Sequence, residues 1–182
     1  VRWPHPTRGP IPPSEFIPIA EKAGLIGPLG DFVLLRACTE AAQWPENVRI
    51  SVNLSPLQFQ QTDVVASVSA ALACSRLAPG RLDLEITESV ELAENAANRL
   101  TLARLRALGV GVSLDDFGIG YSSLSYLRSF PFDRIKIDMS FVRDLGRRED
   151  AAKIIRATIG LANALGMGTT AEGIESEVQR SR

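Results

Sequence analysis

The chain has 182 residues, of which 45% are hydrophobic and 23% charged, and its net charge at pH 7 is −1. This composition is typical of a globular protein with one sizeable core and excludes a disordered chain. The near-zero charge excludes binding of a long nucleic acid through bulk electrostatics, but it permits a small phosphate ligand held by a few local groups. No apolar run is long enough to cross a bilayer. Cys38 and Cys74 match no metal spacing and fit a reduced cytosolic setting, so we expect a cytoplasmic protein whose membrane anchor, if any, lies in another segment.

The first part of the chain predicts an irregular lead-in followed by two helices. Residues 1–18 are rich in proline, and residues 1–3 have the character of the end of a strand. A short helix is expected over 14–24, with Ser14 as its cap and Gly24 at its end. A second helix is expected over 31–44, where apolar residues recur at helical spacing.

From residue 48 onward, strand-like and helix-like segments alternate. The predicted strands are 48–53, 82–87, 110–114, 134–137 and 167–171, and the predicted helices between them are 62–77, 93–108, 122–130 and 148–165. This alternation predicts an α/β fold with a parallel sheet. Because a closed eight-stranded barrel needs about 250 residues, we predict a TIM-type (β/α) barrel that is incomplete in this chain, with about five β/α units. An open doubly wound sheet is the alternative, but no glycine-rich dinucleotide motif follows any strand.

Polar residues recur at alternate positions of the predicted strands, and several stand at the carboxyl ends. The residues sharing a face are Ser51 with Asn53; Asp83, Glu85 and Thr87; Gly111, Ser113 and Asp115; Lys136 with Asp138; and Thr170 with Glu172. The apolar residues between them point to the opposite face, which helices would cover. Polar groups facing a barrel interior must be paired or must bind something, and the carboxyl end is the catalytic end of such barrels.

Asp115 and Asp116 follow a buried apolar run, where two like charges are costly unless a cation offsets them. An isolated Asp-Asp pair is usually a solvated polar turn, but here acids on other strands meet it. Asn53, Glu85 and Asp115 offer hard oxygens to one Mg²⁺, Mn²⁺ or Ca²⁺, and Asp116 could hold a second ion. Lys136 could neutralise an acid, orient water or meet a phosphate, while Glu172 and Glu175 could supply a base and a water-orienting group. Two such cations suit the attack of water on a phosphodiester.

Five motifs in order carry a resemblance to a known family. They are Ser51-Val-Asn-Leu-Ser55, Leu84-Glu-Ile-Thr-Glu88, Asp115-Asp-Phe-Gly-Ile-Gly-Tyr-Ser-Ser123, Ile135-Lys-Ile-Asp138 and Ala171-Glu-Gly-Ile-Glu175. Together they resemble the EAL-domain cyclic-di-GMP phosphodiesterases, and the match spans essentially the whole chain. The resemblance implies a TIM-type barrel and a metal-dependent hydrolase that opens cyclic-di-GMP to linear pGpG.

The resemblance also implies roles for individual residues. Asn53, Glu85 and Asp115 would bind one metal ion, Mg²⁺ or Mn²⁺, and Asp116 would serve a second. Lys136, Glu172 and Glu175 would be catalytic, with Glu172 as the base. Arg2 and Asp138 are assigned to substrate binding. Glu88 would anchor the loop over 118–123, which in the family couples metal binding to a dimer interface.

The chain departs from the family pattern at two places. The Glu-Ala-Leu motif belongs immediately before Val1, and Ile119 replaces the more usual Thr. We therefore expect a single EAL-type domain over 1–182, truncated at both ends, that is unstable or pairs with another copy through exposed sheet edges. The alternatives are a catalytically inactive EAL-type receptor for cyclic-di-GMP and another metal-dependent barrel hydrolase. Expected partners are cyclic-di-GMP, a second copy in a homodimer, and a neighbouring sensory or diguanylate cyclase (GGDEF) domain.

Overall fold

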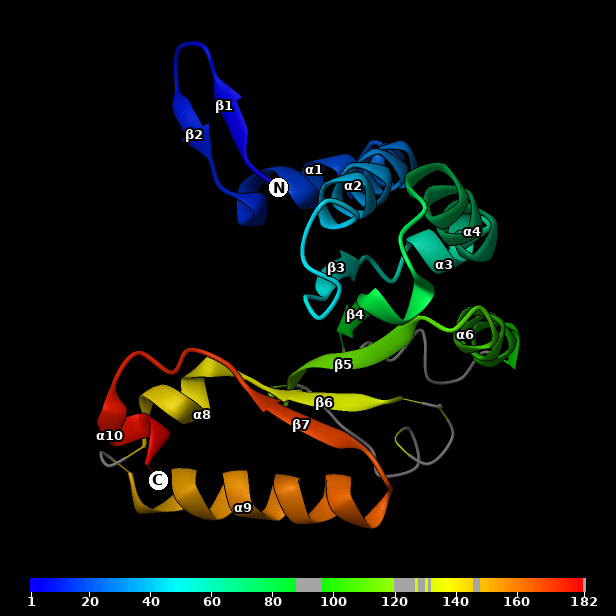
Figure 1. The fold of residues 1–182 in the computed structure, drawn as a ribbon. Coiled ribbons are helices and arrows are strands. Elements are labelled where there is room, and N and C mark those ends of the chain that lie inside the picture. The colour runs from blue at the N-terminus through cyan, green and yellow to red at the C-terminus, as the bar shows by residue number, and fades with distance from the viewer. Residues whose placement is uncertain (88–95, 120–126, 128–129, 131, 146–147, 182) are drawn as a thin grey trace.

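A computed structural model describes residues 1–87, 96–119, 127, 130, 132–145 and 148–181 (Figure 1). Its centre is a five-stranded parallel sheet in the order β3-β4-β5-β6-β7. The strands are β3 (Ile50–Leu54), β4 (Leu82–Thr87), β5 (Gly111–Phe117), β6 (Arg134–Ile137) and β7 (Gly168–Ala171). The sheet is open, not closed into a barrel. The predicted α/β class and the five strands in consecutive order are therefore confirmed.

Helices precede, connect and follow the strands, and the four longest described helices form a layer on one face of the sheet. The described helices are α1 (Pro13–Lys22), α2 (Ile26–Ala41), α3 (Gln58–Gln61), α4 (Val64–Ser75), α6 (Ala96–Ala107), α8 (Met139–Arg143), α9 (Glu149–Ala164) and α10 (Glu177–Arg180), with a short 3₁₀ turn over Pro79–Arg81. The core lies between this layer and the sheet: Leu34 and Leu102 come from the helices, and Leu84, Val112 and Leu114 from the strands. Among the helices placed by the structure, none has the length and apolar character needed to span a membrane.

The N-terminal segment is more ordered than its prolines suggest. β1 (Trp3–His5) and β2 (Gly9–Ile11) form an antiparallel hairpin that projects beyond α1 in Figure 1. The Trp3 ring meets the ring of Phe16 edge-on, with centroids 5.8 Å apart, which attaches the hairpin to α1. The predicted irregular lead-in is therefore wrong for residues 3–11.

Helix boundaries differ from expectation where capping was misassigned. α1 begins at Pro13, and Ser14 lies inside it and does not cap it; proline suits this first position because its missing N–H needs no partner there. α2 begins at Ile26, five positions before the expected start, because Gly27, Pro28 and Gly30 are accommodated in its first turns. Asp63 does cap α4, where its Oδ1 accepts a hydrogen bond from the Ala66 N–H at 3.1 Å.

The central position of β5 gives a test of the core. Leu114 is fully buried, whereas Leu100 on α6 is 63% exposed. We expect Leu114→Ala to lower the free energy of unfolding by about 2–5 kcal/mol, because it removes packed methyl groups and leaves a cavity. The matched Leu100→Ala should change it by about 0.5 kcal/mol at most. Chemical denaturation measures both; equal losses would contradict the placement of the core on this face of β5.

Candidate active site

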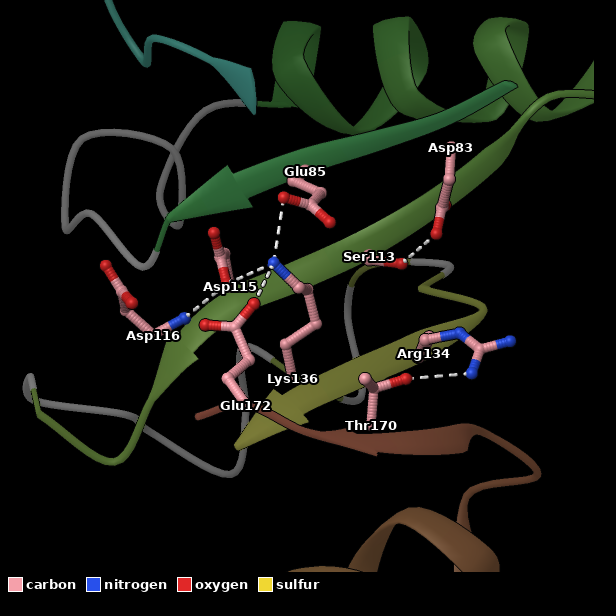
Figure 2. A network of polar contacts seen from close by, with 9 residues as sticks. All are labelled: Asp83, Glu85, Ser113, Asp115, Asp116, Arg134, Lys136, Thr170 and Glu172. Atoms are coloured by element: carbon pink, nitrogen blue, oxygen red, sulfur yellow. Dashed lines mark hydrogen bonds and ion pairs between the residues drawn. The ribbon is translucent and has the colours of Figure 1, made fainter. Parts of the chain in front are cut away.

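Four charged side chains from four consecutive strands converge at the carboxyl end of the sheet (Figure 2). The Lys136 ammonium contacts Glu85 Oε2 at 2.8 Å, Asp115 Oδ1 at 2.9 Å and Glu172 Oε1 at 2.5 Å. Glu85, Asp115 and Lys136 are buried, being 6–8% exposed. These four residues therefore meet at one end of the sheet, as predicted, and form a network of ion pairs.

A second set of polar contacts lies on the same face of the sheet, nearer the amino ends of the strands. The Ser113 hydroxyl donates to Asp83 Oδ2 at 2.8 Å, and Arg134 Nη1 donates to Thr170 Oγ1 at 2.9 Å (Figure 2). Arg134 was not singled out from the sequence, although its spacing of two from Lys136 places both on one face. These hydrogen bonds pair polar side chains that would otherwise be buried or partly buried without a partner.

An extra residue in β5 brings two consecutive carboxylates to the site. Between Leu114 and Phe117, three steps along β5 oppose two steps along β6, from Ile135 to Ile137. Asp116 has a positive φ of 53°, and its N–H donates to Asp115 Oδ1 at 3.0 Å. In a regular strand, neighbouring side chains face opposite ways, so the bulge is what lets both acids reach the same place.

The backbone at Gly118, directly after β5, is closely packed. Gly118 has φ of +100°, and a Cβ there would lie 2.9 Å from the Phe141 ring. Only glycine meets both conditions without strain, because other residues avoid this φ and would collide with the ring. Residues 120–126, and with them the predicted helix over 122–130 apart from Leu127 and Phe130, lie outside the described residues.

Asp115, Asp116 and Glu172 form a group that could hold one cation. One carboxylate oxygen of each lies within 4.8 Å of those of the other two. Oxygens that contact one Ca²⁺ at 2.3–2.6 Å lie at most about 5 Å apart, and Mg²⁺ requires a slightly tighter arrangement. The donor set therefore fits a hard divalent cation. Glu172, predicted as a base, stands among these potential ligands.

The charges perturb one another. The pKa of Asp116 is raised above its ordinary value, first by burial and then by the charges of Asp115, Asp138 and Glu172, with Lys136 acting in the opposite direction. Burial alone would lower the pKa of Lys136, but its hydrogen bonds to Glu172, Glu85 and Asp115 together outweigh burial and raise it. Lys136 is therefore protonated at neutral pH, whereas ionisation of Asp116 is less favourable than that of a free aspartate.

Two other predicted site residues, Asn53 and Arg2, are not members of this network of ion pairs. Asn53 is exposed on β3, in register with Glu85 on β4. It lines a cavity of about 520 Å³ beside α1 and α2, which Val1 and Thr87 also line. Arg2, the predicted phosphate contact, is exposed next to Val1.

Asp138 and Glu175 have additional or different surroundings. Asp138 is buried and caps α8, with Oδ1 accepting from the Ser140 N–H at 2.8 Å, so part of its role is structural. Glu175 is exposed, and its backbone N–H donates to Gln179 Oε1 at 2.8 Å. Glu88, the predicted loop anchor, lies outside the described residues.

Comparison with known proteins was made with the whole chain. The model of the EAL domain family matches residues 1–182. An uncharacterised protein of Sinorhizobium fredii is 53% identical over 178 residues, covering 98% of this chain and 22% of that protein. MucR of Pseudomonas aeruginosa, named as a bifunctional diguanylate cyclase/cyclic di-GMP phosphodiesterase, is 43% identical over 184 residues, covering 99% and 27%. The chain thus spans about a quarter of the length of these curated relatives.

Solved structures agree with the sequence comparison. The structure of the MucR phosphodiesterase in complex with cyclic-di-GMP matches with a TM-score of 0.92 at 43% identity, covering 99% of this chain and 74% of that one. The EAL enzyme Bd1971, bound to cAMP and cyclic-di-GMP, matches with a TM-score of 0.91 at 29% identity, covering 98% and 50%. The open parallel sheet with acids at its carboxyl end is accordingly part of a TIM-like architecture, and the chain belongs to the EAL domain family.

Proposed function

We propose that this chain carries the active site of a metal-dependent phosphodiesterase that hydrolyses cyclic-di-GMP to linear pGpG. The observation that carries the proposal is the convergence of Glu85, Asp115, Asp116 and Glu172 around Lys136 at one end of the sheet. Its membership of a family with relatives named as cyclic-di-GMP phosphodiesterases supports the choice of substrate.

The acids provide for two divalent cations, Mg²⁺ or Mn²⁺. Asp115 and Asp116 would hold one, and Asn53, Glu85 and Asp115 would hold the other, with Asp115 shared. When bound, such cations supply charge neutralisation at the phosphate oxygens and make water a stronger nucleophile. The hard oxygen donors of the site fit this class of ion.

The remaining steps belong to the side chains of this protein. Glu172 would accept one proton of the attacking water as the water oxygen bonds to phosphorus. The bond from phosphorus to the ribose 3′ oxygen would break, and that oxygen would take up a proton from solvent. Lys136, held against Glu172, would orient this carboxylate. Glu175 would support Glu172, while Arg2 would contact a non-bridging phosphate oxygen through its guanidinium, and Asp138 would help to position the substrate.

The wider setting is also a proposal. The name of MucR supports a neighbouring diguanylate cyclase (GGDEF) domain in a longer protein. We further propose a cytoplasmic location, where cyclic-di-GMP acts as a signal, and a homodimer as the functional form.

The unfavourable ionisation of Asp116 in the folded state can be tested by measuring stability in metal-free buffer. Its raised pKa means that the folded state holds the proton more tightly, so ionisation of Asp116 destabilises the fold as pH rises from the unfolded value near 3.9 through the folded value. Asp116→Asn keeps the φ of 53° accessible and removes the charge. We expect it to raise the free energy of unfolding at pH 7 by only about 0.5 kcal/mol, because Asp116 is partly exposed and water screens its charge.

The same denaturation curves provide the control for this variant. At a pH well below 3.9 this carboxyl is protonated in both the folded and the unfolded wild type, so the stabilities of the two proteins should converge there. Addition of Mn²⁺ should stabilise the wild type more than Asp116→Asn. The difference in free energy of unfolding between Asp116→Asn and wild type should be larger at pH 7 than at acid pH. A smaller or negative difference at pH 7 would contradict the destabilising effect assigned to the Asp116 charge.

Activity is tested by mixing the chain with cyclic-di-GMP and Mg²⁺ or Mn²⁺ and following pGpG by chromatography. Asp115→Asn should reduce turnover by about a hundredfold or more, because Asp115 serves both proposed ions. Asp31→Asn on the exposed surface of α2 is the matched control and should retain activity. Cyclic-di-GMP binding without pGpG would refute hydrolysis and favour the receptor alternative.

A further inference from the structure

Lys136 is arranged as an internal substitute for a metal ion. Its ammonium contacts three carboxylate oxygens from three different strand ends: Glu85 Oε2, Asp115 Oδ1 and Glu172 Oε1. An ammonium that fills its three donors with carboxylates in this way makes the same kind of oxygen contacts as a small cation. The side chain of Lys136 is 10% exposed, so water screens these contacts weakly.

The contacts account for how the acids can stand together. Two of the three carboxylates that bind Lys136 are buried, with side chains 8% and 9% exposed for Glu85 and Asp115. Buried carboxylates without a partner would protonate or move apart, because their desolvation and mutual repulsion are costly. The Lys136 charge therefore keeps the carboxylates assembled.

The same carboxylates belong to the potential metal group. Asp115 and Glu172 bind Lys136 and are also members of the group formed with Asp116. A divalent cation at that group would draw on carboxylates that already neutralise the ammonium. It would also be repelled by the ammonium a few ångströms away.

We propose that Lys136 is a positioning residue that assembles the carboxylates as an internal cation and competes with the first divalent ion to bind. This inference rests on the metal site of the proposed function and adds a factor that determines how tightly that site binds its first cation. The cation must displace or weaken ion pairs of Lys136, so its affinity is set lower than the four acids alone would give. The two effects of Lys136 have opposite signs. Loss of a lysine that only assembled the carboxylates would disorder the ligands and weaken cation binding, so tighter binding by a neutral variant identifies the competition.

The test is calorimetric titration of the 182-residue chain with Mn²⁺, without substrate. Lys136→Met removes the charge and retains much of the aliphatic stem, and it should bind the first Mn²⁺ about tenfold more tightly than wild type. Lys136→Arg restores a cation and should return the affinity towards the wild-type value. Lys153→Met, on the exposed surface of α9, is the matched control and should leave the affinity unchanged.

Thermal unfolding supplies a second readout. Without metal, Lys136→Met should melt below wild type, and saturating Mn²⁺ should raise its melting temperature by more than it raises that of wild type. If Lys136→Met does not fold without metal, Lys136→Gln, which retains an N–H donor, takes its place in both measurements.

Unchanged or weaker Mn²⁺ binding by the neutral variants would overturn the proposal, as would the absence of Mn²⁺ binding in all the proteins. Because no substrate is present, the result is independent of hydrolysis. A chain that follows the predicted affinities but produces no pGpG would refute the proposed function and leave this inference standing.

Discussion

The ion pairs of Lys136 are the interaction on which the site depends. They connect β4, β5, β6 and the residue that follows β7, so that four stretches of chain are held by one ammonium. Buried charges of this kind are weak contributors to stability, because desolvation offsets most of their attraction. Their presence at the carboxyl end of the sheet is better explained by chemistry than by folding.

The sheet makes the interaction possible. Leu84, Val112 and Ile135 alternate with the site residues and bury the opposite face beneath the helices. The hydrophobic layer therefore fixes the register that places Glu85, Asp115 and Lys136 on the inner face. The residues that stabilise the core and the residues of the candidate site therefore lie on opposite faces of the same strands.

Much of this arrangement could be predicted from the sequence because it follows from periodicity. The bounds of β4 and β6 were predicted exactly, since Leu82–Thr87 and Arg134–Ile137 combine strand-forming residues with strict alternation. The convergence of Glu85, Asp115, Lys136 and Glu172 followed from the rule that carboxyl ends of parallel strands meet at one edge.

Other features depend on contacts that periodicity does not encode. The hairpin of residues 3–11 is attached by the Trp3–Phe16 contact, which proline content conceals. The early start of α2 includes Gly27 and Gly30, where an added Cβ would collide with Thr62 and Gln58, so close packing favours glycine there. The inclusion of Asp116 with Asp115 and Glu172 depends on the geometry of the bulge, which no pattern of residue types specifies.

The bulge in β5 makes the site sensitive to chain length as well as to residue type. Asp115 and Asp116 are the only residues between Leu114 and Phe117, so loss of one residue there would restore regular pairing with β6 and would also remove one of the two aspartates. A single-codon deletion here would therefore remove a potential ligand and the bulge that presents it in one step. Alignments that treat gaps here as neutral would misjudge which relatives retain a complete site.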